Sequence, residues 1–150
     1  MQRRPTLSSF HTVVFTLVLL GVAPARAGVG IWIAPADLDR LPTSGAAWDN
    51  LLNEANQPTG VPNLADQDSP VDVRVMAKAL VYARTKTDSY RQDVLAAIDT
   101  VTYGNTESGG TTLSLCRGLV AYVLAADLVG LPSQLDTDFR SFLVRTRTED

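Results

Sequence analysis

The stretch TTLSLCRGLVAYVLAADLV, residues 111–129, decides the fold class of this chain. Its apolar residues recur at intervals of three and four and lie around most of the circumference of a helix. We expect this helix to be buried on several sides and to end at Gly130 and Pro132. Arg117 and Asp127 make it too polar for a membrane span.

Helical periodicity continues on both sides of this stretch, and sustained alternation is confined to Val29–Ile33. A short helical turn is expected at 35–41, a helix from 44 to about 57, and further helices that begin near 70, 88 and 134. We expect Ser44, Ser69 and Asp88 to cap the starts of helices. We expect Gly104 to end a helix with a positive φ. The sequence therefore predicts an all-α fold of antiparallel helical hairpins joined by short loops.

Residues 1–27 have the features of an export signal. Arg3 and Arg4 form a charged start, an apolar run follows at 13–22, and Ala25-Arg26-Ala27 supplies a cleavage site. The apolar run is about half the length of a membrane span. We expect a mature chain of residues 28–150, periplasmic or secreted and without a membrane span.

Charge and residue usage exclude several function classes. Cleavage after Ala27 removes three arginines, so the net charge falls from −3 to −6, and it also removes His11, which is the only histidine. The mature chain then has no Ser-His-Asp or Cys-His catalytic unit and no histidine-ligated metal. One cysteine, Cys116, excludes a disulfide framework. An acidic chain without a basic cluster argues against nucleic-acid binding, and no cofactor site is expected.

Four segments together resemble the N-terminal helices of secreted bacterial alginate-lyase-like proteins. They are GIWIAPADLDRLPTSGAAWDNLL at 30–52, PNLADQDS at 62–69, VMAKALVYART at 75–85 and LCRGLVAYVLAADLVGL at 115–131. The resemblance covers about residues 30–145 and rests on helix patterns rather than on catalytic signatures.

This resemblance implies part of an (α/α) toroid, a ring of helical hairpins that holds an acidic polysaccharide such as alginate. Enzymes of this kind cleave by β-elimination: the uronate carboxylate is neutralised, a base removes the C5 proton and an acid protonates O4. The Asn-His motif of the family does not occur in this sequence. We therefore expect an N-terminal portion of a polysaccharide lyase that is inactive alone and has no catalytic residues of its own. The alternative is a non-catalytic secreted helical module that binds a glycan or a protein.

Four residues are candidates for substrate binding. Arg117 can neutralise a uronate, or it can pair with a carboxylate or extend along the surface. Tyr122 can carry a proton, or it can be a core residue with a satisfied hydroxyl. These two lie about 140° apart around a helix and cannot form one site unaided. Asn63 and Gln67 belong to a polar loop that can touch sugar hydroxyls or cap the following helix. No metal site is expected, because this loop lacks the glycine and the glutamate of a calcium loop.

Other apolar residues are assigned to packing. Trp48 falls in helical register with neighbouring leucines and is expected in the core, and Cys116 is expected to be a small buried residue. In the last helix an apolar stripe is expected to lack a covering neighbour and so to cause self-association. Its members are Leu135, Phe139, Phe142 and Leu143.

The export signal makes a direct prediction. In a bacterial host that exports the protein, N-terminal sequencing of the extracytoplasmic form will read Gly28 as the first residue. Substituting Ala27 with a large residue will slow this processing, because the cleavage site requires small side chains. Exported protein that still begins at Met1 would contradict the prediction.

Overall fold

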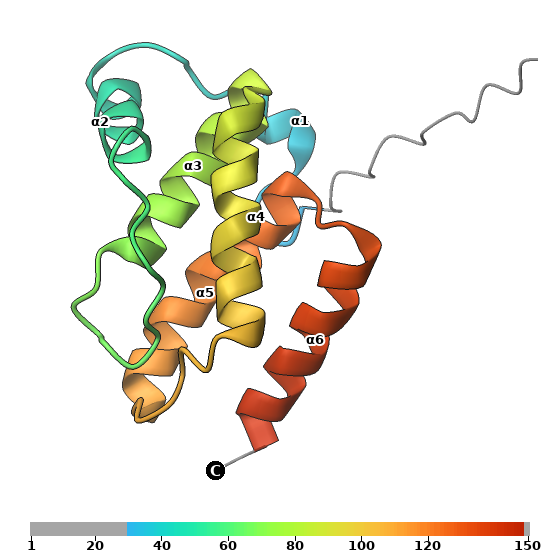
Figure 1. Cartoon of the computed structure of the whole chain (residues 1–150). Helices are drawn as coiled ribbons and strands as arrows, with labels where there is room; N and C mark the ends of the chain where they lie inside the picture. The colour runs from blue at the N-terminus through green and yellow to red at the C-terminus, as the bar shows by residue number, and fades with distance from the viewer. Residues whose placement is uncertain (1–29, 149–150) are drawn as a thin grey trace, which may run out of the picture.

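The computed structural model describes residues 30–148, and within them the chain forms six helices and no strand (Figure 1). The helices are α1 (Pro35–Leu38), α2 (Ala46–Ala55), α3 (Val71–Thr85), α4 (Asp88–Tyr103), α5 (Thr112–Val129) and α6 (Ser133–Thr148). The all-α prediction is confirmed. The predicted export signal, residues 1–27, lies outside the described residues.

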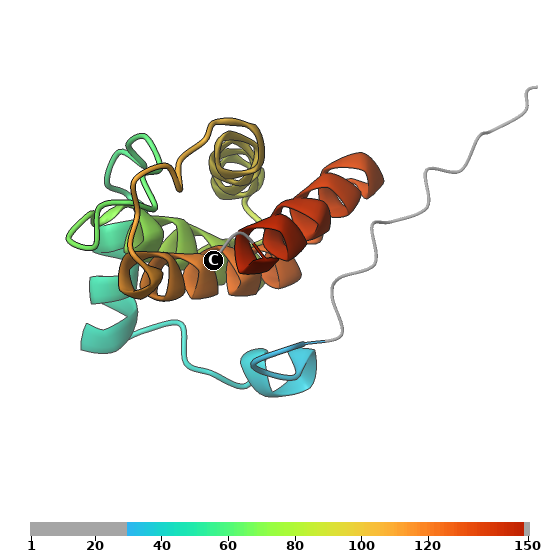
Figure 2. The same cartoon turned by 90° about the horizontal axis from the view of Figure 1, so that it is seen from below.

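The four long helices form two stacked hairpins (Figure 1). In the first hairpin, α3 turns into α4 through two residues, and in the second, α5 turns into α6 through three. Helices α3 and α5 pack side by side and run in one direction, while α4 and α6 run in the opposite direction and contact each other. Helices α1 and α2 lie on the other side of α3 and α5 from α4 (Figure 2).

Helix α3 is buried on two faces, and each face contributes to a separate apolar cluster. Val75 and Ala79 face the main core, where they meet residues of α4, α5 and α6. Ala77 and Val81 face Ala55 and the apolar side of α2. The small side chains on α3 let both neighbouring helices approach closely. Trp48, expected in the core, is only partly buried and packs at the edge of the second cluster.

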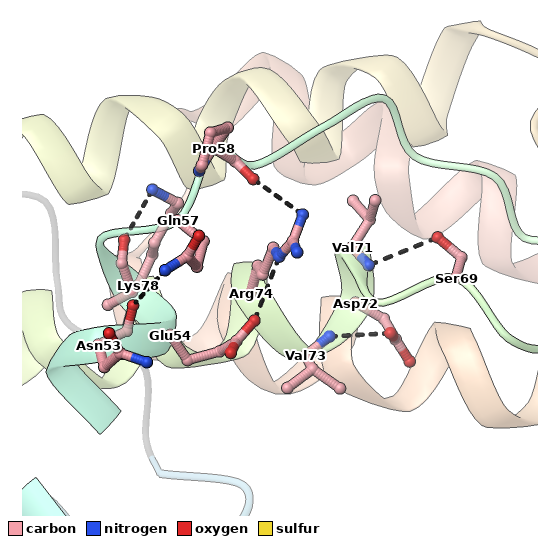
Figure 3. A network of polar contacts seen from close by, with 11 residues as sticks. Asn53, Glu54, Gln57, Pro58, Ser69, Val71, Asp72, Val73, Arg74 and Lys78 are labelled. Carbon is pink, nitrogen blue, oxygen red and sulfur yellow. Dashed lines mark hydrogen bonds and ion pairs between the residues drawn. The ribbon is translucent and has the colours of Figure 1, made fainter. Parts of the chain in front are cut away.

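Two basic side chains of α3 hold the C-terminal end of α2 (Figure 3). Lys78, only 4% exposed, donates through Nζ to the carbonyl oxygen of Ala55 and to Asp93 Oδ2, both at 2.8 Å. One turn earlier, Arg74 donates to Glu54 Oε1 at 3.1 Å and to the carbonyl oxygen of Pro58 at 3.2 Å. Carbonyls at a helix C-terminus lack helical partners and carry partial negative charge, so they are good acceptors for these cations.

The segment before α2 is hydrogen-bonded to the C-terminal ends of α3 and α5. The backbone N–H of Ile31 donates to Asp127 Oδ2 at 2.8 Å. Arg84 donates to Asp39 Oδ1 at 3.3 Å and to the carbonyl oxygen of Leu41 at 2.8 Å. Residues 31–41 therefore cross from α5 to α3, with α1 between these two attachments.

Several expected helix boundaries are wrong in detail. Gly104 has φ −99°, and the positive φ falls on Asn105 at 51°. A glycine is still required at 104, because a Cβ there would lie 2.5 Å from the carbonyl oxygen of Thr100. Ser44 does not cap α2, which begins after Gly45, and Asp88 is the first residue of α4 rather than its cap.

The expectation that α5 is buried on several sides is also wrong. Its buried positions form one stripe, and Leu113 and Val120 on the opposite side are 61% and 58% exposed. Cys116, expected to be buried, is exposed as well. Periodicity shows which residues are apolar but not how many neighbours cover them, and α5 packs chiefly on α3 and α4.

By length and composition α5 is apolar enough to cross a membrane, with a mean hydropathy of 1.6 over 18 residues. The expectation that Arg117 and Asp127 make this helix too polar for a membrane span is therefore wrong by this criterion. Core helices of globular proteins meet the same criterion, and α5 contributes Tyr122, Ala125 and Val129 to the main core.

The apolar stripe of α6 is covered within the chain. Phe139 and Phe142 are buried at 3% and 1% exposure, and their rings stack with centroids 6.2 Å apart. Leu135 and Leu143 are partly buried against the same core. The expectation of an uncovered stripe is wrong because α6 packs on α4, and the reason for expecting self-association through this stripe disappears with it.

The position of Lys78 makes a prediction about stability. Lys78→Met keeps most of the side-chain stem but leaves the Ala55 carbonyl without its donor, and we expect a loss of about 1–3 kcal/mol. Urea unfolding of residues 28–150 measures this loss.

The matched control is Arg140→Met, because the Arg140–Asp136 pair is exposed and within one helix. This control should cost less than about 0.5 kcal/mol. Equal effects of the two substitutions would show that Lys78 does not hold α2.

Candidate functional site

The loop between α2 and α3, residues 56–70, folds on itself through short polar contacts. Asn63 Oδ1 accepts from the N–H of Ala65 at 3.1 Å, and Asp66 Oδ1 accepts from the N–H of Asp68 at 3.0 Å. These carboxylate and amide oxygens stabilise turns of the loop itself. Neither of these two side chains caps α3. Of loop 56–70, Ser69 reaches the first turn of α3, with its Oγ 3.4 Å from the N–H of Val71.

Loop 56–70 is fixed against the start of α5. The N–H groups of Leu64 and Ala65 donate to the carbonyl oxygen of Thr106, at 2.9 and 3.2 Å, in the loop that precedes α5. The Leu64 side chain is buried in the main core. It lies so near α5 that a Cβ at Gly118 would be 3.0 Å from Leu64 Cδ2. The glycine therefore allows the loop to lie directly on the helix.

The first turn of α5 is fixed by a reciprocal cap. Thr111 Oγ1 accepts from the N–H of Ser114 at 3.2 Å, and Ser114 Oγ accepts from the N–H of Thr111 at 2.9 Å. This is a capping box with serine in the place where glutamate or glutamine is usual. Because Ser114 stands where glutamate or glutamine is usual, the capping box is not recognisable from the sequence. The cap sets the position of Arg117 and Gly118 one turn later.

A small pocket lies where loop 56–70 meets α3 and α5. The space open to the centre of a water molecule is about 10 Å³, which is room for about one water. All four residues singled out in the sequence line it, with six others. The lining residues are Asn63, Leu64, Asp66, Gln67, Ser69, Asp72, Ser114, Arg117, Gly118 and Tyr122.

Arg117 and Tyr122 share this pocket although they lie on different faces of α5. Tyr122 is 1% exposed and lines the inner part, whereas Arg117 is exposed and lines the outer part. The angular argument against a common site holds for an isolated helix. Here loop 56–70 closes over the helix and supplies the remaining wall.

The hydroxyl of Tyr122 is protonated and lacks a partner. Burial raises its pKa well above the usual range, and the nearby charge of Asp72 raises the pKa further. Within residues 30–148 it makes no hydrogen bond, but it is not among the fully enclosed polar atoms that lack a partner, so it is open to the space of the pocket.

Charge around the pocket is mixed. Arg117 forms no ion pair with any residue in the described part of the chain, so its guanidinium is available to a ligand. Two lining carboxylates, Asp66 and Asp72, oppose it. Sequence reasoning did not single out Asp72, Ser114 or Gly118. An aspartate in the first turn of a helix is common, so Asp72 gives no signal of its own, and the approach of loop 56–70 to Gly118 depends on tertiary packing.

A second, larger hollow lies between α5 and α6, apart from the four candidate residues. Its volume is about 640 Å³, and its walls include Val123, Leu131, Phe139 and Leu143, with Ile31 at one side. This open groove has mixed walls, in which Asp127 and an Asp136–Arg140 pair lie beside the apolar side chains.

Within residues 30–148, no three histidine, cysteine, aspartate or glutamate side chains are grouped so that they could hold a metal ion. The chain matches no protein-family model, no curated protein and no solved structure, so its resemblance to alginate-lyase-like proteins stays a prediction.

Proposed function

We propose that this chain binds an acidic polysaccharide at the pocket formed by loop 56–70 and α5, as the N-terminal helical part of an alginate-lyase-like protein. One observation carries the proposal. The fold brings two segments about 50 residues apart to one pocket: loop 56–70, with Asn63 and Gln67, and α5, with Arg117 and Tyr122.

The available chemistry suits a uronate lying across the pocket. A sugar ring is far larger than the single-water space inside, so it lies at the mouth, where Arg117, Asn63 and Gln67 are exposed. The unpaired guanidinium can bind a carboxylate through two parallel hydrogen bonds. Side-chain amides donate to and accept from sugar hydroxyls. Arg117 has to outweigh Asp66 and Asp72, so binding depends strongly on it.

The helix arrangement supports the same proposal. A toroid of helical hairpins needs two layers, one made of the first helices of successive hairpins and one made of the second. Helices α3 and α5 form such a pair, and α4 and α6 form the other. A partial (α/α) toroid is therefore the architecture that we propose for this all-helical chain.

We further propose that residues 28–150 do not catalyse β-elimination alone. The reaction needs a base at C5, and this part of the sequence contains no histidine. Tyr122 holds its proton too tightly to act as a base, because burial and Asp72 raise its pKa. The pocket thus offers neither a histidine nor a readily deprotonated tyrosine for this step.

A non-catalytic protein-binding module is the second candidate function, and the groove between α5 and α6 favours it. Grooves of several hundred Å³ with apolar walls and a few polar groups are typical of binding sites. This candidate becomes the better one if the wild-type chain binds no saccharide.

Loss of the guanidinium tests the binding proposal. Arg117→Ala should weaken binding of an alginate oligosaccharide by about tenfold or more, because a charge-assisted hydrogen bond contributes about 1.5–3 kcal/mol. Arg147→Ala removes the same charge from an exposed position on α6 and should leave affinity within about twofold. Isothermal titration calorimetry at two salt concentrations measures both. Equal weakening by the two variants would point to non-specific attraction.

Catalysis is tested separately. Incubating residues 28–150 with alginate should give no rise in the ultraviolet absorbance of unsaturated uronates above a no-enzyme control. An active alginate lyase in a parallel reaction shows that the substrate is competent. A sustained rise with the purified chain would overturn the non-catalytic part of the proposal.

A further inference from the structure

The Tyr122 hydroxyl is a donor that is open to the inner end of the pocket. Its side chain is almost wholly enclosed, yet the hydroxyl makes no hydrogen bond within the described residues. Buried polar groups in folded proteins are nearly always satisfied by protein, water or ligand. The Tyr122 hydroxyl is not one of the fully enclosed atoms without a partner, so it is open to the pocket, and a partner from outside the chain can reach it there.

The space beside this hydroxyl fits one oxygen atom. It holds about one water molecule. Two features keep it small and open: Gly118 has no side chain to fill it, and Leu64 holds loop 56–70 in place against α5. A sugar ring cannot enter, but a single hydroxyl projecting from a ring can.

The charges beside the space select the kind of oxygen. Asp72 lines the same pocket and its negative charge acts on Tyr122. A tyrosine donor next to a carboxylate acceptor complements a group that both accepts and donates a hydrogen bond. A hydroxyl does both. A ligand carboxylate accepts only and would be repelled by Asp72.

We infer that Tyr122 is a specificity-determining residue, whose hydroxyl donates to a ring hydroxyl of the saccharide inserted into the pocket beside Asp72. The uronate carboxylate then stays outside, at Arg117. The inference rests on the proposed function and deepens it, since it fixes which end of the sugar faces inward.

Removing this one oxygen tests the inference. Tyr122→Phe should weaken binding of an alginate oligosaccharide by about tenfold or more, because a site built to hydrogen-bond a hydroxyl loses much when the partner is absent. The urea midpoint should not fall, since the hydroxyl has no protein partner to lose. Tyr103→Phe is the matched control: its hydroxyl binds Asp138 on the exposed surface, and its removal should leave affinity unchanged.

The outcomes separate this inference from the proposed function. If the wild type binds the oligosaccharide and Tyr122→Phe binds it equally, the inference is overturned and the proposed function stands. If the wild type binds cellotriose but not the uronate, and Tyr122→Phe weakens that binding, the inference stands and the acidic ligand is wrong. Binding of neither saccharide by the wild type overturns both. A fall in stability that accompanies the loss of affinity would assign Tyr122 a structural role instead.

Discussion

The contact between Lys78 and the end of α2 is the constraint on which the N-terminal half of the structure depends. An ammonium group taken out of water requires partners, and here they come from two other helices, the Ala55 carbonyl of α2 and the Asp93 carboxylate of α4. Because Nζ of Lys78 on α3 bonds to both α2 and α4, it fixes the C-terminal end of α2 relative to the other two helices. Loop 56–70 starts from this position, and the pocket is built from that loop.

The same chemistry recurs at other ends of elements. Arg91 of α4 donates to the carbonyl oxygens of Val129 and Gly130, at 3.1 and 2.8 Å, where α5 finishes. Arg84 does so for Leu41 before α2. A cation that accepts nothing and donates several hydrogen bonds satisfies carbonyls that no helix can. Basic residues in this acidic chain therefore serve packing as much as surface charge. Arg117 differs from them, because it donates to no carbonyl oxygen within residues 30–148.

Hydrophobic periodicity and the proline and glycine residues that end helices predicted the helices, because both are local properties of the sequence. The breaks at Pro58–Pro62 and Gly130–Pro132 lie where the structure has loops. Coverage could not be predicted in the same way. The sequence of the stripe with Phe139 and Phe142 is the same whether α4 covers it or it faces water. Leu113 is likewise apolar in the sequence whether it is buried or exposed. The pocket depends on the approach of Leu64 to Gly118, residues 54 positions apart, which no local pattern encodes. Two of its residues were nonetheless visible in the sequence, because Arg117 and Tyr122 stand among the mainly apolar residues of α5.

The bond from Ile31 to Asp127 joins residues 96 positions apart in sequence. During synthesis the N-terminal segment emerges first, but its partner on α5 is made only after α2, α3 and α4. Local helical contacts form quickly, whereas contacts of large sequence separation are slow because a long loop must close. The contact of residues 31–41 with α5 therefore closes a loop that contains α2, α3 and α4, and we expect it to form late in folding.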